Sequence, residues 1–216
     1  CLPEQGHPMD ALQAAVAALG MFYPGRNVQD VENNYWSTVR LVAKLPTIVA
    51  AWARLRHGDE YIPPRDDLGF SENFLYMLTE TEPVPLWGNI FDDCLVLHAE
   101  HTMNASTFTG MVTASTLADP YTVVASSIGA LKGPLHGGAN EEVVQMLKEI
   151  GEPRRVRSYL EEQLSAKRKL MGFGHRVYKV KDPRATILQG LCERLFKECG
   201  SSPLYEVAIE VERVAA

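Results

Sequence analysis

The 216-residue sequence lacks the features that mark several protein classes. It has no uncharged apolar run of about 18 residues, so no membrane span is expected. Positive charge is not in excess, because 27 Asp and Glu residues outnumber 21 Lys and Arg residues, and the formal net charge of −6 argues against nucleic acid as the main partner. Glycine and proline occur at ordinary frequencies, and 46% hydrophobic residues exclude a disordered chain. The length suits one large domain or two small ones.

Motifs for metal, disulfide and nucleophile chemistry are also missing. None of the four cysteines forms a C-x-x-C pair, and Cys192 and Cys199 stand two helical turns apart. We therefore expect reduced thiols, no zinc knuckle and a cytoplasmic protein. No G-x-S-x-G elbow occurs and no cysteine stands beside a plausible activating base, which disfavours nucleophilic catalysis. No phosphate-binding P-loop motif occurs either.

Helical periodicity, by contrast, runs through almost the whole sequence. Pro8 opens the first helix, Asn27 is a candidate cap of the second, and Pro46 is expected to interrupt that second helix. Further helices are predicted over residues 71–78, 86–100, 106–117, 121–131, after Gly138, and over 153–166, 184–199 and 203–214. Because no segment alternates with period two, we predict an all-α fold with roughly ten helices.

Positive charge gathers in one part of this acidic sequence, between Gly151 and Arg184. The cations there are Arg154, Arg155, Arg157, Lys167, Arg168, Lys169, Arg176, Lys179, Lys181 and Arg184. A concentration of this kind is typical either of a site for an anionic ligand or of a solvated helix face.

Two histidine settings suggest chemistry. His98 and His101 are spaced to share one face of a helix, but the H-E-x-x-H and Glu-x-x-His patterns of metal sites are absent, so we predict no metal. His136 lies in the segment Gly-Pro-Leu-His-Gly-Gly-Ala-Asn, a tight turn directly before a predicted helix. A neutral imidazole at a helix N-terminus can donate a hydrogen bond to a developing enolate or oxyanion. The alternative is a helix-start turn with an incidental histidine.

A third setting joins Gly172-Phe173-Gly174-His175 to the nearby Asp182-Pro183-Arg184. Glycine lets the backbone approach a ligand without a Cβ clash, and arginine can grip a carboxylate with two hydrogen bonds. With several cations beside them, these residues indicate a site for a phosphate- or carboxylate-bearing polyanion. The residues thus favour acid–base and hydrogen-bond chemistry by histidines on an anionic substrate.

These motifs, taken in order, resemble citrate synthase. The resemblance rests on residues 97–107, 133–140, 172–178 and 182–184, with the opening residues 7–10, and the short loops are similar to the smaller bacterial form related to 2-methylcitrate synthase. It implies a citrate synthase-like helical fold, a homodimer, and the condensation of acetyl-CoA with oxaloacetate without metal or other cofactor. It further implies that residues 1–136 are large-domain helices with the dimer interface and oxaloacetate site, and that 137–216 are part of a small domain with the CoA loop.

The resemblance also implies roles for individual residues. His136 matches the histidine that hydrogen-bonds the acetyl-CoA carbonyl as its enol forms, and His175 the one that polarises and protonates the oxaloacetate ketone. His101 and Arg184 match residues that bind oxaloacetate, Arg184 by clamping a carboxylate, and Asn104 is a further substrate-binding candidate.

For CoA, the resemblance points to the loop that holds the adenine, Gly172, Phe173 and Gly174, and to Lys179 near the phosphates. The family's catalytic aspartate lies in a later Pro-Asn-Val-Asp type of segment, with two further substrate arginines beyond it. The chain begins at Cys1 rather than Met and stops at Ala216, before any of them. We therefore expect a piece of a longer protein that is inactive alone.

Two alternatives to citrate synthase stay open at this point. The chain could belong to a 2-methylcitrate synthase that uses propionyl-CoA, or to a helical scaffold without catalytic activity. The histidines and Arg184 in their motifs argue against the scaffold.

Overall fold

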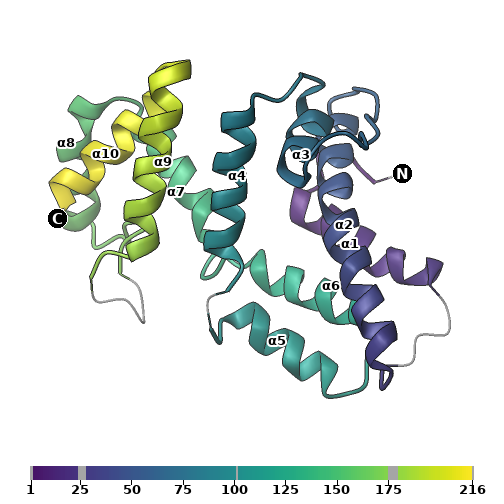
Figure 1. Cartoon of the computed structure of the whole chain (residues 1–216). Coiled ribbons are helices and arrows are strands. Elements are labelled where there is room, and N and C mark those ends of the chain that lie inside the picture. Colours follow the sequence, from purple (N-terminus) through teal and green to yellow (C-terminus); the bar gives the residue numbers. More distant parts are fainter. Residues whose placement is uncertain (1, 24–27, 101, 175–179, 216) are drawn as a thin grey trace. The chain divides into compact units, whose positions relative to one another are not determined.

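The computed structural model describes residues 2–23, 28–100, 102–174 and 180–215 (Figure 1). These residues form helices and no strand, which confirms the predicted all-α fold. The α-helices are α1 (Pro8–Leu19), α2 (Val31–Leu55), α3 (Phe70–Thr79), α4 (Pro85–His98), α5 (Ala105–Ala114), α6 (Pro120–Leu131), α7 (Ala139–Ile150), α8 (Val156–Ser165), α9 (Pro183–Cys199) and α10 (Pro203–Ala215), and the short 3-10 helices are η1 (Gly20–Phe22) and η2 (Pro153–Arg155). None of these described helices is long and apolar enough to cross a membrane.

The chain divides into two compact units, Cys1–Lys132 and Gly133–Ala216. The boundary falls just before the turn that carries His136, whereas the sequence reading placed it just after that residue. His136 therefore starts the second unit together with α7. The correspondence of these units to a large and a small domain stays a prediction.

Helix starts follow from capping chemistry. Asp30 caps α2 by accepting a hydrogen bond from the backbone N of Glu32 at 3.0 Å, and Asp119 accepts from the backbone N of Tyr121 at 3.0 Å at the start of α6. An acidic or amide side chain here satisfies an amide that has no partner within the helix. The candidate cap Asn27 lies outside the described residues, and the observed cap of α2 is Asp30.

The predicted interruption at Pro46 is wrong, because Pro46 lies inside α2, which is one continuous helix of 25 residues. An internal proline costs a helix about 3 kcal/mol through the lost hydrogen bond and the ring clash. Packing on both sides compensates: Leu41 and Ala50 are 4% and 1% exposed, and Leu45 packs against the same core as Leu41. Tertiary burial therefore outweighs the local preference of the sequence.

The core of the first unit joins α1, α2 and α6. Its buried members are Val16, Leu41, Tyr121, Ala125 and Ile128. Helix α5 packs closely on α6, where a Cβ added at Gly110 would lie only 2.7 Å from the Oγ of Ser127.

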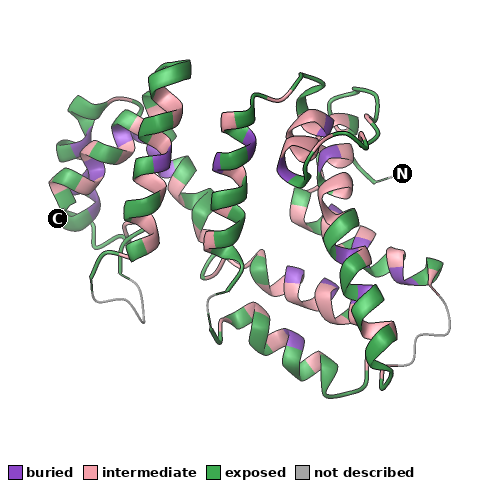
Figure 2. Cartoon of the chain, viewed as in Figure 1, coloured by how far each residue is buried: buried purple, intermediate pink, exposed green. Residues whose placement is uncertain are grey.

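The core of the second unit joins α7, α8 and α10. Its buried members are Met146, Leu147, Ile150, Val156, Leu160, Val207 and Val211 (Figure 2). Helix α9 supplies none of them: its one buried side chain among the described residues, Leu191, lies outside this cluster. The placement of α9 therefore depends on other contacts.

Candidate active site

The turn that carries His136 is closed by backbone hydrogen bonds. The carbonyl of Gly133 accepts from the backbone N of His136 at 2.9 Å and from that of Gly138 at 3.1 Å, and the carbonyl of His136 accepts from Ala139 at 3.1 Å. Leu135 is 87% exposed, whereas His136 is half-buried. Because α7 begins at Ala139, the histidine precedes a helix N-terminus, as predicted.

Arg184 is fixed at the first turn of α9 by Asp182. The Asp182 carboxylate caps the helix, accepting from the backbone N of Arg184 at 2.9 Å, and also accepts from the guanidinium Nη2 at 2.6 Å and Nε at 3.1 Å. Both side chains are about three-quarters buried, with 27% and 25% exposure. The sequence reading treated Asp182 only as part of a motif. An aspartate before a proline at a helix start was the signal for this cap.

The glycine loop needs glycine for conformational reasons. Gly172 and Gly174 have φ of +86° and +75°, in the region that L side chains rarely adopt. A Cβ added at Gly172 would also lie 3.2 Å from the Cγ2 of Val143 on α7. Phe173 between them is 43% exposed. The loop therefore lies against α7 with its aromatic side chain partly open to solvent.

We expect Gly172→Ala to lower the free energy of unfolding of the second unit by about 1–2 kcal/mol, because alanine is strained at this positive φ. Gly190→Ala is the matched control: Gly190 lies inside α9, where an added Cβ meets nothing within 4 Å, and alanine there is expected to stabilise by about 0.5–1 kcal/mol. Urea unfolding of the 216-residue chain measures both. Equal stability of Gly172→Ala and the unsubstituted chain would contradict this account.

Asn104 has a structural role that the sequence reading missed. Its side-chain oxygen accepts from the backbone N of Thr107 at 2.9 Å and caps α5 in the first unit. The signal was present, since asparagine before an apolar helical run is a preferred N-cap. A substitution at this position would therefore alter α5 as well as any ligand contact.

Three predicted site residues, His101, His175 and Lys179, lie outside the described residues. The prediction that His98 and His101 share one face of a helix is wrong, because α4 ends at His98 rather than at Glu100. The Nδ1 of His98 contacts the carbonyl of Cys94 at 2.6 Å within that last turn.

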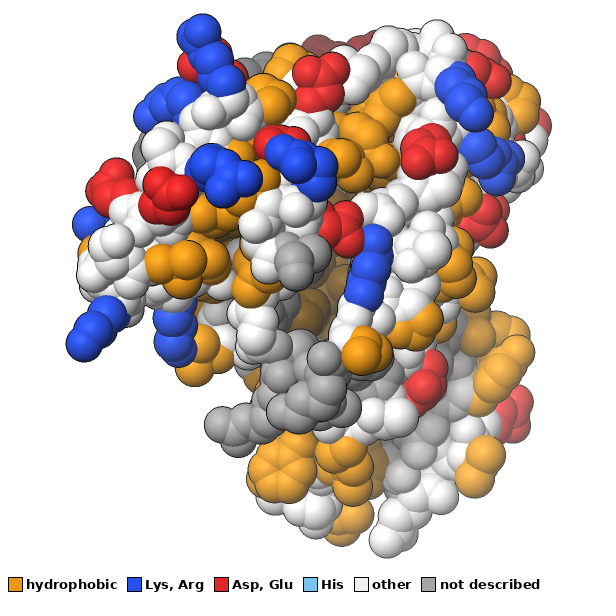
Figure 3. Space-filling model, turned by 90° about the vertical axis from the view of Figure 1, so that its left-hand side faces the viewer, with side chains coloured by type: hydrophobic (Ala, Val, Ile, Leu, Met, Phe, Trp, Pro, Cys, Tyr) orange, Lys and Arg blue, Asp and Glu red, His pale blue; other side chains and the backbone are white. Residues whose placement is uncertain are grey.

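Many cations of the basic segment have acidic neighbours. Arg154 pairs with Glu152 at 2.7 Å, which raises the pKa of Arg154, and Arg168 lies 3.8 Å from Glu162. Figure 3 shows Lys and Arg interspersed with Asp and Glu on one face of the molecule. For these exposed pairs a solvated helix face is the better interpretation. Among the cations of this segment that the structure describes, Arg184 is best placed for a ligand, because Asp182 holds it and its side chain is about three-quarters buried.

Comparison with known proteins decides the family. The sequence model described as "Citrate synthase, C-terminal domain" matches residues 1–216. The chain belongs to the citrate synthase family. It is 60% identical over 214 residues to the citrate synthase of Synechocystis sp., which covers 99% of the chain and 54% of the Synechocystis protein. The chain spans about half the length of the curated citrate synthases it matches.

Solved citrate synthases also share its fold. The crystal structure from Pyrobaculum aerophilum matches with a TM-score of 0.84 and 43% identity, covering 98% of the chain and 55% of that protein. The Thermoplasma acidophilum citrate synthase, solved as a ternary complex with carboxymethyl coenzyme A and oxaloacetate, matches with a TM-score of 0.87 and 30% identity over 99% of the chain and 56% of that protein. The citrate synthase-like helical fold implied by the sequence motifs is thereby confirmed.

Proposed function

We propose that the chain supplies substrate-binding residues and the two hydrogen-donating histidines of a citrate synthase, which joins acetyl-CoA, oxaloacetate and water to give citrate and CoA. The observation that carries the proposal is the 60% identity over 214 residues to the Synechocystis citrate synthase. The ligands of the Thermoplasma structure, oxaloacetate and a CoA derivative, support the same substrate pair. No metal or other cofactor is needed, with acetyl-CoA acting as a substrate.

The difficult step is enol formation, because the α-carbon of a thioester is a very weak acid. We assign His136 as the donor to the thioester carbonyl oxygen as negative charge develops there, a role suited to an imidazole in the turn before α7. A base must take the methyl proton at the same time. The resemblance to citrate synthase implies that this base is the family's catalytic aspartate, which is not among these 216 residues.

The second substrate is a dianion and needs cationic and hydrogen-bonding groups. Arg184 would clamp one carboxylate, and the Asp182 contact sets the orientation of its guanidinium beforehand. His101 and Asn104 would bind the same molecule, and His175 would donate a proton to the ketone oxygen as the new carbon–carbon bond forms. The enol carbon attacks the ketone carbon, and water then cleaves the thioester.

For CoA, Gly172, Phe173 and Gly174 would hold the adenine and Lys179 the phosphates. The positive φ at both glycines and the exposed ring of Phe173 suit close contact with a flat base. Closure over the bound substrates would exclude water from the thioester until condensation is complete.

We further propose a cytoplasmic homodimer that acts in the tricarboxylic acid cycle. The dimer interface is assigned to the first unit, where large apolar side chains are exposed on α2 and on α5: Val31, Trp36, Val39, Phe108 and Met111. Exposed apolar side chains on helices are often covered at interfaces between subunits.

The test uses a chimera in which the chain replaces the matched 214 residues of the Synechocystis citrate synthase. We expect thiol release from acetyl-CoA that depends on oxaloacetate, and slower release from propionyl-CoA. Release with propionyl-CoA as the better substrate would favour 2-methylcitrate synthase, and no release with either would overturn the proposal.

The 216-residue chain alone is expected to show no turnover, because it lacks the base. The same thiol assay, run on the chain and on the chimera at equal concentration, measures this difference. Comparable turnover by both proteins would contradict the assignment of the base to a segment outside the chain.

A further inference from the structure

Side chains of helices α9 and α10 contact each other at two levels. Near the connecting loop, the rings of Phe196 and Tyr205 lie 4.9 Å apart. Two helical turns away on each helix, Gln189 of α9 donates a hydrogen bond to the carboxylate of Glu212 on α10. The apolar contact thus holds the C-terminal end of α9, and the polar contact holds the half of α9 that carries Arg184.

The polar contact is a closed ring of three side chains. Lys181 lies 2.5 Å from the Oε1 of Glu212 and donates to the Oε1 of Gln189 at 2.6 Å, while Gln189 donates to Glu212. These interactions lower the pKa of the Glu212 carboxyl, so it is a carboxylate at neutral pH. Lys181 precedes the helix and Gln189 follows its first turn, so the ring holds the chain on both sides of Arg184.

This arrangement is significant because α9 contributes nothing to the hydrophobic cluster of the second unit. A lysine just before a helix start is also disfavoured by the helix dipole, unless an acidic group neutralises it. Glu212 supplies that group from a different helix. Its neighbour Val211 is 4% exposed and packs in the core of the second unit. The helix that carries the Glu212 carboxylate is therefore held by that core.

We propose that Glu212 is a positioning residue, which fixes the N-terminal end of α9 through Lys181 and Gln189 and thereby sets the place of Arg184. The proposal rests on the proposed function, since Arg184 is taken to clamp an oxaloacetate carboxylate. Asp182 orients the guanidinium locally, and Glu212 fixes the helix that carries both residues.

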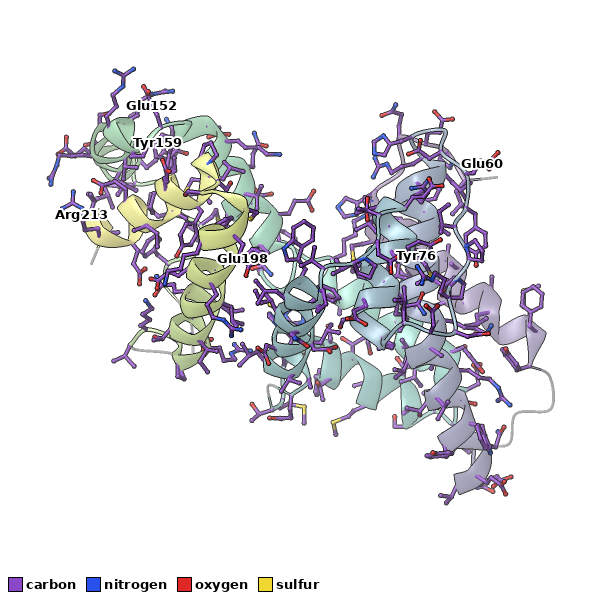
Figure 4. All side chains as sticks on the ribbon, turned by 45° about the horizontal axis from the view of Figure 1, so that its top comes forward. Glu60, Tyr76, Glu152, Tyr159, Glu198 and Arg213 are labelled. Carbon is purple, nitrogen blue, oxygen red and sulfur yellow. The ribbon has the colours of Figure 1, made fainter. Side chains whose placement is uncertain are left out.

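The principal variant is Glu212→Ala in the Synechocystis chimera, with Glu210→Ala as the matched control. Glu210 pairs with Arg213 on the same helix at 2.6 Å, and Figure 4 shows Arg213 on the side of α10 that faces away from α9. We expect Glu212→Ala to raise the oxaloacetate KM about tenfold while kcat and the acetyl-CoA KM stay within about twofold. Glu210→Ala should change none of the three.

The charge-exchanged double variant K181E/E212K keeps an ion pair between the two positions. The oxaloacetate KM of the double variant is expected to lie much closer to that of the unsubstituted chimera than the KM of either single variant does. A general loss of stability would not predict this result. Single and double variants with the same KM, or Glu212→Ala indistinguishable from Glu210→Ala, would overturn the inference. An equal change in both KM values would overturn it as well.

Hydrogen exchange on the 216-residue chain separates this inference from the proposed function. In Glu212→Ala, amides of the first half of α9 should exchange faster, while those of α7 and α8 keep their rates. Unchanged exchange in α9 would overturn the role of Glu212 whatever the enzyme assay shows. An inactive unsubstituted chimera would instead count against the proposed function.

Discussion

Replacing His136 by alanine in the Synechocystis chimera is expected to lower kcat about 10³-fold, with oxaloacetate binding little changed. The imidazole is taken to stabilise charge that exists only as the enol forms, and loss of one such donor typically costs 10²- to 10³-fold. The substitution leaves the turn intact, because its closure by Gly133, Gly138 and Ala139 uses backbone atoms alone. Steady-state thiol release, with both substrates saturating, measures the effect.

His57→Ala is the control for this prediction. His57 lies in the exposed turn after α2, and its backbone N donates to the carbonyl of Arg54 at 2.9 Å. It should leave kcat unchanged. If His136→Ala kept more than about a tenth of the activity, the assignment of the histidine as the carbonyl donor would be wrong.

Replacing Arg184 by leucine is expected to raise the oxaloacetate KM about 10²-fold. The variant loses a charge-assisted pair of hydrogen bonds, each worth about 1.5–3 kcal/mol, and leaves the Asp182 carboxylate without the guanidinium it contacts at 2.6 Å. Arg184→Lys should recover only part of this loss, because an ammonium group cannot reproduce the two-point contact.

Arg213→Leu provides the comparison for Arg184. Its side chain is 65% exposed and pairs with Glu210 on its own helix, so the oxaloacetate KM should not change. A similar rise in KM for both variants would show a general effect of lost charge and would contradict the assignment of Arg184 as the carboxylate clamp.

Most helices could be predicted because proline, asparagine and aspartate mark their starts in this sequence. The two errors have physical causes that a linear pattern does not reveal. Pro46 is tolerated because Leu41 and Ala50 are buried on either side of it. Helix α4 ends at His98, where the backbone N of Ala99 donates to the carbonyl of Val96, three residues back, and Thr102 then takes a positive φ of +55°.

The local structure of the candidate site was predictable where its residues belong to short motifs, and their roles stay predictions. In the histidine turn, the glycine loop and Asp182-Pro183-Arg184, the residues that determine the local structure lie within a few positions of one another in the sequence. The contact of Glu212 with Lys181 joins positions 31 residues apart in the sequence, one on α10 and one just before α9, and helical periodicity does not specify which helices lie together. Contacts between residues so far apart in the sequence can be identified only from the three-dimensional structure.

The central claim is that these residues join acetyl-CoA to oxaloacetate through a carbon–carbon bond. The most direct measurement is NMR spectroscopy of the products formed by the chimera from acetyl-CoA carrying an isotope label in its methyl carbon. The account predicts that the label appears in a methylene carbon of citrate, in step with thiol release and only when oxaloacetate is present. Label recovered as free acetate, or no labelled citrate at all, would contradict it.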